Sequence, residues 1–167
     1  MKRQELTDSL SVKQITVLLA DDHVAVRKQL KLLVEADGDI TVVAEAKNGR
    51  VAVDLTKSLQ PEVVVMDVAM PLLNGLEATR QIMEISPATR VLILSAHPDP
   101  EYITQAVIFG ASGYLVKHTS TQILAQAVRK VCKGNTFFDP SISQSLRDEC
   151  QEMFDKAELL KKKPARR

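Results

Sequence analysis

The sequence predicts an α/β fold in which helices cover both faces of a parallel β-sheet. The first observation is a series of short, nearly unbroken apolar runs, at residues 15–20, 41–46, 63–66, 91–94 and 113–116. Such runs are typical of strands buried on both faces, whereas half-exposed strands alternate apolar and polar residues. The second observation is that a helix-periodic segment follows each run, as in strand–helix–strand crossovers. We therefore expect a five-stranded, doubly wound sheet, and right-handed crossovers favour the flavodoxin-like strand order.

The expected helices are recognised by the spacing of their apolar residues and by their ends. In the first helix, Val26, Leu30 and Leu33 recur at intervals of four and three, which places them on one face. Pro61 ends the second helical segment, and Gly110 ends the fourth. The apolar faces of the third, fourth and fifth helices are formed by Leu76, Thr79, Ile82 and Met83, by Tyr102, Ala106 and Phe109, and by Leu124, Ala127, Val128 and Val131.

The chain divides into three parts. Its 167 residues are enough for one domain with a core of its own. Residues 1–14 mix charged and polar side chains without a sustained period, so we expect a flexible N-terminal tail. Residues 15–137 carry the alternating strands and helices, and residues 138–167 form a helical C-terminal extension with a basic end.

The extension combines an apolar stripe with polarised charge. Apolar side chains recur every three or four positions, at Ile142, Leu146, Cys150, Met153, Ala157 and Leu160. Five acidic residues and one basic residue lie within 138–155, whereas six basic residues and one acidic residue lie within 156–167. The stripe has two interpretations: the helix packs on its own domain, or it mediates homodimerisation or docking on a partner. Basic residues at a chain end are usually solvated, so nucleic acid is not an expected partner.

The composition excludes several classes of protein. Hydrophobic residues make up 45% and charged residues 26%, which excludes a wholly disordered chain. No apolar run exceeds four residues, which excludes a transmembrane helix and a signal peptide. Cys132 and Cys150 cannot form a disulfide framework and have no zinc-site spacing. We therefore expect a cytoplasmic protein without membrane insertion.

Polar side chains follow four of the predicted strands at the point where each ends. They are Asp21 and Asp22, Asp67, Ser95, and Lys117. Because the carboxyl ends of parallel strands meet at one edge of the sheet, these side chains should converge there. Three carboxylates at close range repel one another, and a divalent cation relieves the repulsion. Mg²⁺ prefers such oxygen ligands and bridges to phosphate, while a lysine supplies a point charge for a phosphoryl group.

These residues lie in segments that resemble the receiver domain of bacterial two-component response regulators. The resemblance covers roughly residues 15–134. It rests on Leu-Leu-Ala-Asp-Asp-His (18–23), Val-Val-Val-Met-Asp-Val-Ala-Met-Pro-Leu-Leu-Asn-Gly-Leu-Glu-Ala (63–78), Val-Leu-Ile-Leu-Ser-Ala (91–96) and Gly-Ala-Ser-Gly-Tyr-Leu-Val-Lys (110–117). The Asp-Val-Ala-Met-Pro stretch and the Asn-Gly that follows are most similar to the NarL/LuxR-type branch of the family.

The resemblance implies a phospho-accepting site that uses Mg²⁺. Asp67 is then the nucleophile that accepts a phosphoryl group from the phosphohistidine of a sensor histidine kinase or phosphotransfer protein. Asp22, Asp67 and the backbone carbonyl of Ala69 would hold Mg²⁺, with Asp21 acting directly or through a metal-bound water. The protein is then a signalling module that assists its own phosphorylation and slow dephosphorylation, with no other cofactor.

The resemblance also implies a switch. Lys117 would pair with Asp67 and later with a phosphoryl oxygen, and Ser95 would bond another phosphoryl oxygen. Phosphorylation should draw Ser95 inward and let Tyr114 bury, which changes the protein-interaction surface built from residues 99–117. Tyr114 has a second interpretation as an ordinary core aromatic. His97, two residues after Ser95, is a candidate for tuning the lifetime of the aspartyl phosphate.

Two alternatives remain at this point. The chain is either a stand-alone receiver or a transcriptional regulator without its DNA-binding domain, because only about 30 residues follow Phe138 and a domain needs ~40. An aspartyl-nucleophile phosphatase of the haloacid-dehalogenase type would need an Asp two residues after its nucleophile. Ala69 occupies that position, which argues against such an enzyme.

Overall fold

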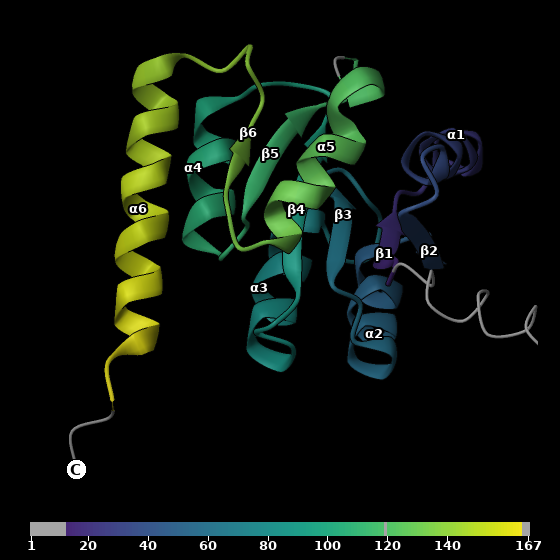
Figure 1. Ribbon diagram of the computed structural model, residues 1–167, viewed down its shortest axis with the longest axis horizontal. Helices are drawn as coiled ribbons and strands as arrows, with labels where there is room; N and C mark the ends of the chain where they lie inside the picture. The colour runs from purple at the N-terminus through teal and green to yellow at the C-terminus, as the bar shows by residue number, and fades with distance from the viewer. Residues whose placement is uncertain (1–12, 119, 165–167) are drawn as a thin grey trace, which may run out of the picture.

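Residues 13–118 and 120–164 are described by the computed structural model, and they contain a parallel sheet with helices on both faces (Figure 1). The predicted N-terminal tail lies almost wholly outside these residues. The strand order is β2-β1-β3-β4-β5-β6, and every neighbouring pair is parallel. The strands are β1 (Ile15–Ala20), β2 (Ile40–Ala46), β3 (Val63–Asp67), β4 (Arg90–Ser95), β5 (Gly113–Val116) and β6 (Phe137–Phe138). The α/β class and the flavodoxin-like order of the first five strands are confirmed.

The number of strands is a correction to the sequence-based prediction, because the sheet has six strands and not five. β6 pairs with β5 through Gly113 opposite Phe137 and Tyr114 opposite Phe138. A strand of two residues has no periodicity to detect, so only its pairing partner identifies it. The part of the chain assigned to the start of the extension therefore belongs to the sheet.

Helices cover the two faces unequally. They are α1 (Val24–Glu35), α2 (Gly49–Leu59), α3 (Gly75–Ile85), α4 (Pro100–Ile108), α5 (Ser120–Cys132) and α6 (Gln144–Lys162). One apolar core joins α1 and α5 to one face of the sheet, and a second core joins α2, α3, α4 and α6 to the other. Successive strand residues supply opposite cores: Val17 and Leu19 pack into the first, Leu18 and Ala20 into the second. This two-sided burial explains why the strands appear as unbroken apolar runs.

The loop after β3 is held tightly where it passes the end of the sheet. Asn74 caps α3 by accepting a hydrogen bond from the backbone N–H of Glu77 at 2.9 Å. Gly75 lies so close to β3 that a Cβ atom there would stand 1.9 Å from the carbonyl oxygen of Asp67. Its own N–H donates to the carbonyl of Val68 at 2.9 Å. The absence of a side chain at Gly75 therefore lets α3 begin directly beside Asp67.

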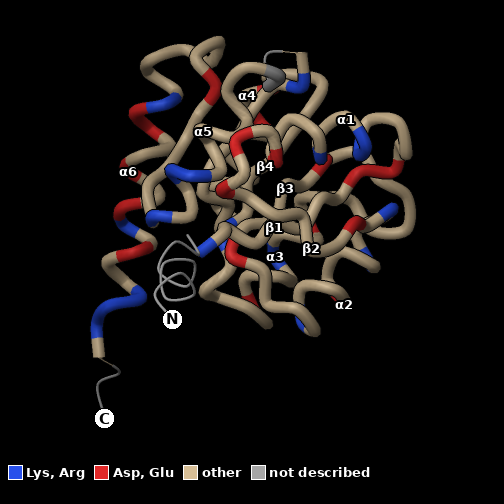
Figure 2. The backbone as a smooth tube through the Cα atoms, turned by 45° about the vertical axis from the view of Figure 1, so that its right-hand side comes forward, with Lys and Arg blue, Asp and Glu red and all other residues tan. Residues whose placement is uncertain are grey.

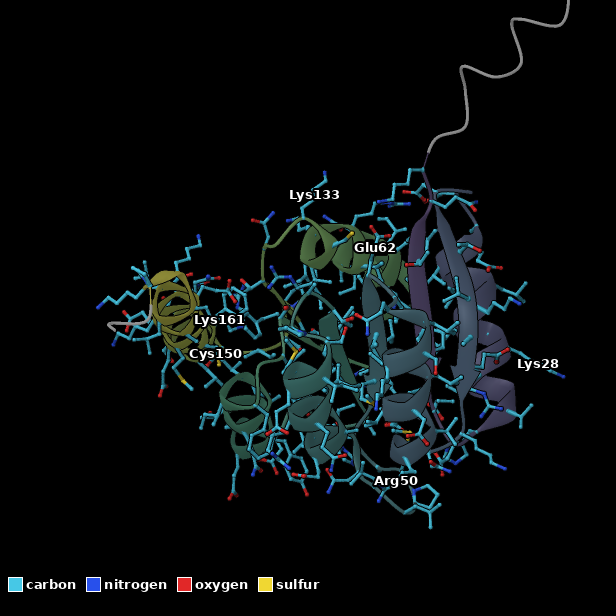
Figure 3. The ribbon with its side chains drawn as sticks, turned by 90° about the horizontal axis from the view of Figure 1, so that it is seen from below. Lys28, Arg50, Glu62, Lys133, Cys150 and Lys161 are labelled. Carbon is cyan, nitrogen blue, oxygen red and sulfur yellow. The ribbon has the colours of Figure 1, made fainter. Side chains whose placement is uncertain are left out.

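α6 packs along α4 on the second face (Figures 1 and 3). Cys150 and Phe154 are 0% and 8% exposed, and they share a core with Ile103 and Val107 of α4. The apolar stripe turns outward beyond this point, because Leu160 near the end of the helix is 69% exposed. The first half of the stripe is thus occupied by the domain itself, while the second half faces solvent.

The charge of α6 changes sign along its length. Its acidic residues lie between Asp148 and Glu158, and lysines dominate its end (Figure 2). Among the described helices, none combines the length and the apolar character needed to cross a membrane.

The packing of α6 on α4 predicts the effect of shortening Phe154. Phe154→Ala should lower the free energy of unfolding by about 3 kcal/mol, because it leaves a cavity between the two helices. Urea unfolding measures this loss, and faster hydrogen exchange of the α6 amides should accompany it. Leu160→Ala is the matched control and should change stability by less than about 0.5 kcal/mol, since its side chain is exposed. Equal effects of the two substitutions would contradict the docked position of α6.

Candidate functional site

The carboxyl edge of the sheet brings together the polar side chains that the sequence singled out. Asp21 and Asp22 directly follow β1, and Asp67 ends β3. A ligand atom from each of these carboxylates, together with one from His23, lies within 4.8 Å of the others. The predicted convergence of the three aspartates is therefore present in the structure.

Lys117 reaches this cluster from the end of β5. Its Nζ lies 2.8 Å from Oδ2 of Asp21 and 3.3 Å from Oδ1 of Asp67. The backbone N–H of Lys117 donates to the carbonyl of Ser95 at 2.8 Å, which fixes the ends of β4 and β5 against each other. One ammonium group thus faces two of the three carboxylates from a neighbouring strand.

Burial dominates the electrostatics of Asp67, which is 4% exposed. Removal of its carboxylate from water raises the pKa of Asp67 above its ordinary value. The charge of Lys117 and a hydrogen bond from the backbone N–H of Ala69 oppose this rise, whereas the charge of Asp21 adds to it. Asp67 is therefore a carboxylate whose charged form is insufficiently compensated by the protein alone.

The same surroundings that disfavour the charged form of Asp67 favour the charged form of Lys117. Burial disfavours its charge, but the hydrogen bond to Asp21 and the attraction of Asp67 outweigh burial and raise the pKa of Lys117. Lys117 therefore stays an ammonium group at neutral pH, and it remains available as a point charge beside Asp67.

One carboxylate oxygen of Asp22 indicates that this cluster can hold a metal ion. Its Oδ1 is buried and has no hydrogen-bond partner among the described residues. An unsatisfied carboxylate oxygen is costly, and here it lies among other carboxylate oxygens within 4.8 Å. Carboxylate oxygens are the ligands that Mg²⁺ prefers, and no cysteine joins the cluster. The donor set therefore fits a hard divalent cation.

His23 is the member of the site that the sequence interpretation missed. Its Nδ1 lies 3.0 Å from Oδ1 of Asp22, without hydrogen-bond geometry, and 3.2 Å from Oδ1 of Asp21. Its backbone N–H also donates to Oδ1 of Asp21 at 2.8 Å. The direct succession Asp-Asp-His was the available signal, but the side chain is 67% exposed, and a histidine after a strand is commonly solvated.

Ser95 and Tyr114 are linked through the loop that follows β4. The hydroxyl of Tyr114 donates to the backbone carbonyl of His97 at 2.8 Å. The backbone N–H of His97 donates to Oγ of Ser95 at 3.3 Å. Tyr114 is already completely buried in this structure, so its expected burial on phosphorylation would not change the position seen here. Burial raises the pKa of its phenol. The two predicted switch residues therefore hold the same short loop.

An open cavity of about 700 Å³ gives access to the site. Asp67, Ala69, Ser95, His97 and Lys117 are among the residues that line it. Of the other residues predicted for the site, Asp21 and Tyr114 are hydrogen-bonded to lining residues, and a carboxylate oxygen of Asp22 lies within 4.8 Å of one of Asp67. The cavity leaves room for a phosphate-bearing donor to approach Asp67.

The fold and this cluster agree with what a comparison with protein families finds. The chain matches the response regulator receiver domain over residues 17–129. It therefore belongs to this family, as the resemblance of its motifs predicts, and its relatives are of the NarL/LuxR type.

Curated relatives extend beyond the length of this chain. The chain is 33% identical over 153 residues to the transcriptional regulatory protein DegU of Brevibacillus brevis, with 92% of this chain and 65% of that protein covered. It is 39% identical over 132 residues to YdfI of Bacillus subtilis, a transcriptional regulatory protein, with 79% and 62% covered. The chain thus spans somewhat less than two thirds of each of these relatives.

Solved structures show the same fold. A two-component response regulator of the LuxR family from Aurantimonas is 34% identical and superposes with a TM-score of 0.77, over 82% of this chain and 98% of that one. The receiver domain of a NarL response regulator from Mycobacterium tuberculosis is 32% identical, with a TM-score of 0.71 over 74% and 99%. CheY of Borrelia burgdorferi, solved with CheX, BeF₃ and Mg²⁺, is 27% identical, with a TM-score of 0.67 over 71% and 90%.

The raised pKa of Asp67 predicts a stability effect that depends on pH. A carboxyl group whose pKa is higher in the folded than in the unfolded state destabilises the fold once it ionises, and this penalty grows as pH rises. In the absence of divalent cations, Asp67→Asn should therefore raise the free energy of unfolding at pH 8, with a gain that shrinks towards pH 4. Urea unfolding across this range measures the gain. Asp54→Asn, at an exposed position on α2, is the control and should show no such trend. A loss of stability in Asp67→Asn at pH 8 would contradict the electrostatic assignment.

Proposed function

We propose that this receiver domain accepts a phosphoryl group on Asp67 from the phosphohistidine of a sensor histidine kinase or phosphotransfer protein. The observation that supports this most directly is the position of Asp67. It is a buried carboxylate at the end of an open cavity, with Nζ of Lys117 3.3 Å from its Oδ1. Membership of the receiver family supports the same role.

The transfer exchanges one bond for another. An Oδ atom of Asp67 attacks phosphorus, a P–O bond forms, and the P–N bond of the donor breaks so that its electron pair returns to the imidazole. Lys117 neutralises part of the charge on the phosphoryl oxygens, and the hydroxyl of Ser95 donates a hydrogen bond to one of them. The chain contributes position and charge, because phosphoryl transfer needs little covalent chemistry from the protein.

We assign the magnesium site to Asp22, Asp67 and the backbone carbonyl of Ala69, with Asp21 acting directly or through water. The unsatisfied Oδ1 of Asp22 and the close group of carboxylate oxygens support this assignment. When bound, Mg²⁺ supplies charge neutralisation for the phosphoryl oxygens and for the carboxylates themselves. The presence of Mg²⁺ with BeF₃ in the structure of the Borrelia relative is consistent with such a site.

Phosphorylation then switches a protein-interaction surface through Ser95 and Tyr114. Both residues hold the loop at His97, directly before α4, so a displacement of Ser95 towards the phosphoryl group moves a segment that Tyr114 also holds. His97 is among the residues that line the same cavity as Asp67, so it is a candidate for tuning the lifetime of the aspartyl phosphate. The surface of residues 99–117 is the part that changes.

The protein acts in the cytoplasm as a signalling module, with only its own phosphorylation and slow dephosphorylation as reactions. Ala69 lacks the acid–base group that a hydrolase of the dehalogenase type would place there. A second candidate function is transcriptional regulation through a DNA-binding domain beyond this chain. The observation behind this alternative is that curated relatives longer than this chain are transcriptional regulatory proteins.

A homodimer through α6 is a further part of the proposal. The first half of its apolar stripe is covered by α4, so self-association would use the exposed end of the helix at Leu159 and Leu160.

Phosphoryl uptake tests the central proposal. With acetyl phosphate and Mg²⁺, the intact mass of the chain should increase by one phosphoryl group, and Asp67→Asn should abolish the adduct. Asp54→Asn is the control and should retain it, because Asp54 is exposed on α2 and outside the site. An adduct that persists in Asp67→Asn would overturn the assignment of the nucleophile.

Metal binding gives a separate prediction. Mg²⁺ at a hundred times its Kd should stabilise the fold by about 2.7 kcal/mol, because the ion binds only the folded chain. Thermal unfolding with Mg²⁺ or with a chelator measures the shift in Tm, and Asp22→Asn should remove most of it. The shift should persist in Asp54→Asn, and an undiminished shift in Asp22→Asn would contradict the assigned ligand.

A further inference from the structure

A second buried carboxylate, Asp139, lies outside the phosphorylation site. It is 0% exposed and directly follows β6, between the sheet and the start of α6. Its Oδ2 accepts a hydrogen bond from the backbone N–H of Val116 at 2.9 Å, and its Oδ1 accepts one from the N–H of Ser141 at 2.9 Å. Its own N–H donates to the carbonyl of Tyr114 at 2.8 Å. Asp139 therefore joins the edge of β5 to the chain that leads into α6.

The bond between Val116 and Asp139 lies at the end of β5, directly before Lys117. Backbone N–H groups of a strand point alternately to its two neighbours. Lys117 uses its N–H to bond Ser95 on the β4 side, so Val116 directs its N–H to the opposite side. There the paired register with β6 ends at Tyr114. The carboxylate of Asp139 thus takes the place of a strand partner at the residue directly before Lys117.

We infer that Asp139 is a positioning residue for the phosphorylation site, acting through β5 on Lys117 and Tyr114. The inference rests on the proposed function. Hydrogen bonds now hold the end of β5 from both sides, from Ser95 and from Asp139. Nζ of Lys117 lies 2.8 Å from Oδ2 of Asp21 and 3.3 Å from Oδ1 of Asp67. A small displacement of the Lys117 backbone therefore changes both contacts.

The same residue connects the site to the C-terminal extension. The carbonyl of Asp139 accepts a hydrogen bond from the N–H of Ile142 at 3.0 Å, and this bond closes the turn that leads into α6. Ile142 is itself buried in the core shared by α4, α6 and Tyr114. Residues beyond the family match therefore contribute to the geometry around Lys117.

The test compares phosphoryl uptake with metal binding in the full chain. Asp139→Ala should lower the initial rate of uptake from acetyl phosphate roughly 10- to 100-fold, the scale on which misplacement of a catalytic group acts. The Kd for Mg²⁺ from calorimetry should stay within about twofold of the unaltered value, because the proposed ligands lie at the ends of β1 and β3 and not on β5. Asp139→Asn keeps one acceptor oxygen for the two hydrogen bonds that the carboxylate accepts, so it should lower the rate clearly, but by a smaller factor than Asp139→Ala. Asp155→Ala removes an exposed carboxylate from α6 and should leave both quantities unchanged.

The outcomes separate this inference from the proposed function. Failure of the unaltered chain to take up a phosphoryl group would overturn both. If the unaltered chain and Asp139→Ala take up the phosphoryl group at the same rate, only the positioning role is overturned. The same holds if Asp139→Ala loses rate and Mg²⁺ affinity by equal factors. Should Asp139→Ala fail to fold, the rate and Kd of Asp139→Asn decide the question: a reduced rate at unchanged Kd supports the inference, and an unchanged rate overturns it.

Discussion

Three carboxylates and one lysine occupy the same few ångströms at the carboxyl edge of the sheet, and the surrounding structure is organised around that group. Asp21 and Asp67 are almost completely buried, yet Lys117 is the cation that reaches both of them. Burial outweighs the opposing charge of Lys117, and the charge of Asp21 adds to the effect of burial, so the pKa of Asp67 rises. Such an excess of buried negative charge favours a divalent cation, and in the proposed function Asp67 is the nucleophile that accepts the phosphoryl group.

The fold holds this group in place through the ends of its strands. Aspartates that repel one another would move apart if they were on mobile loops, but here β1 and β3 are neighbours with a parallel register, so their carboxyl ends lie side by side. Gly75 allows α3 to begin against the carbonyl of Asp67, and the N–H of Lys117 ties β5 to Ser95. The stability supplied by the two apolar cores therefore supports a charge arrangement that is unfavourable by itself.

The C-terminal part of the chain is tied into this arrangement. β6 pairs with β5 at Tyr114, Asp139 continues the pairing with its carboxylate, and α6 packs on α4 through Cys150 and Phe154. β6 pairs with β5, which carries Tyr114, and α6 packs on α4, which follows the loop that Ser95 and Tyr114 hold. A change at Asp67 that displaces this loop would therefore also disturb the contacts of β6 with β5 and of α6 with α4.

Much of this protein was determined by its sequence alone. The strands and the main helices follow from short-range patterns, because burial on two faces makes an unbroken apolar run and burial on one face makes a helical period. Asp21, Asp22, Asp67, Ser95 and Lys117 were predictable as a group, since the carboxyl ends of parallel strands must meet. Tertiary structure decided what depends on partners far along the chain. The pairing of Phe137 and Phe138 with β5 and the bond from Asp139 to Val116 have no local signature. Each is defined by a residue that only the folded backbone brings within a hydrogen bond's reach.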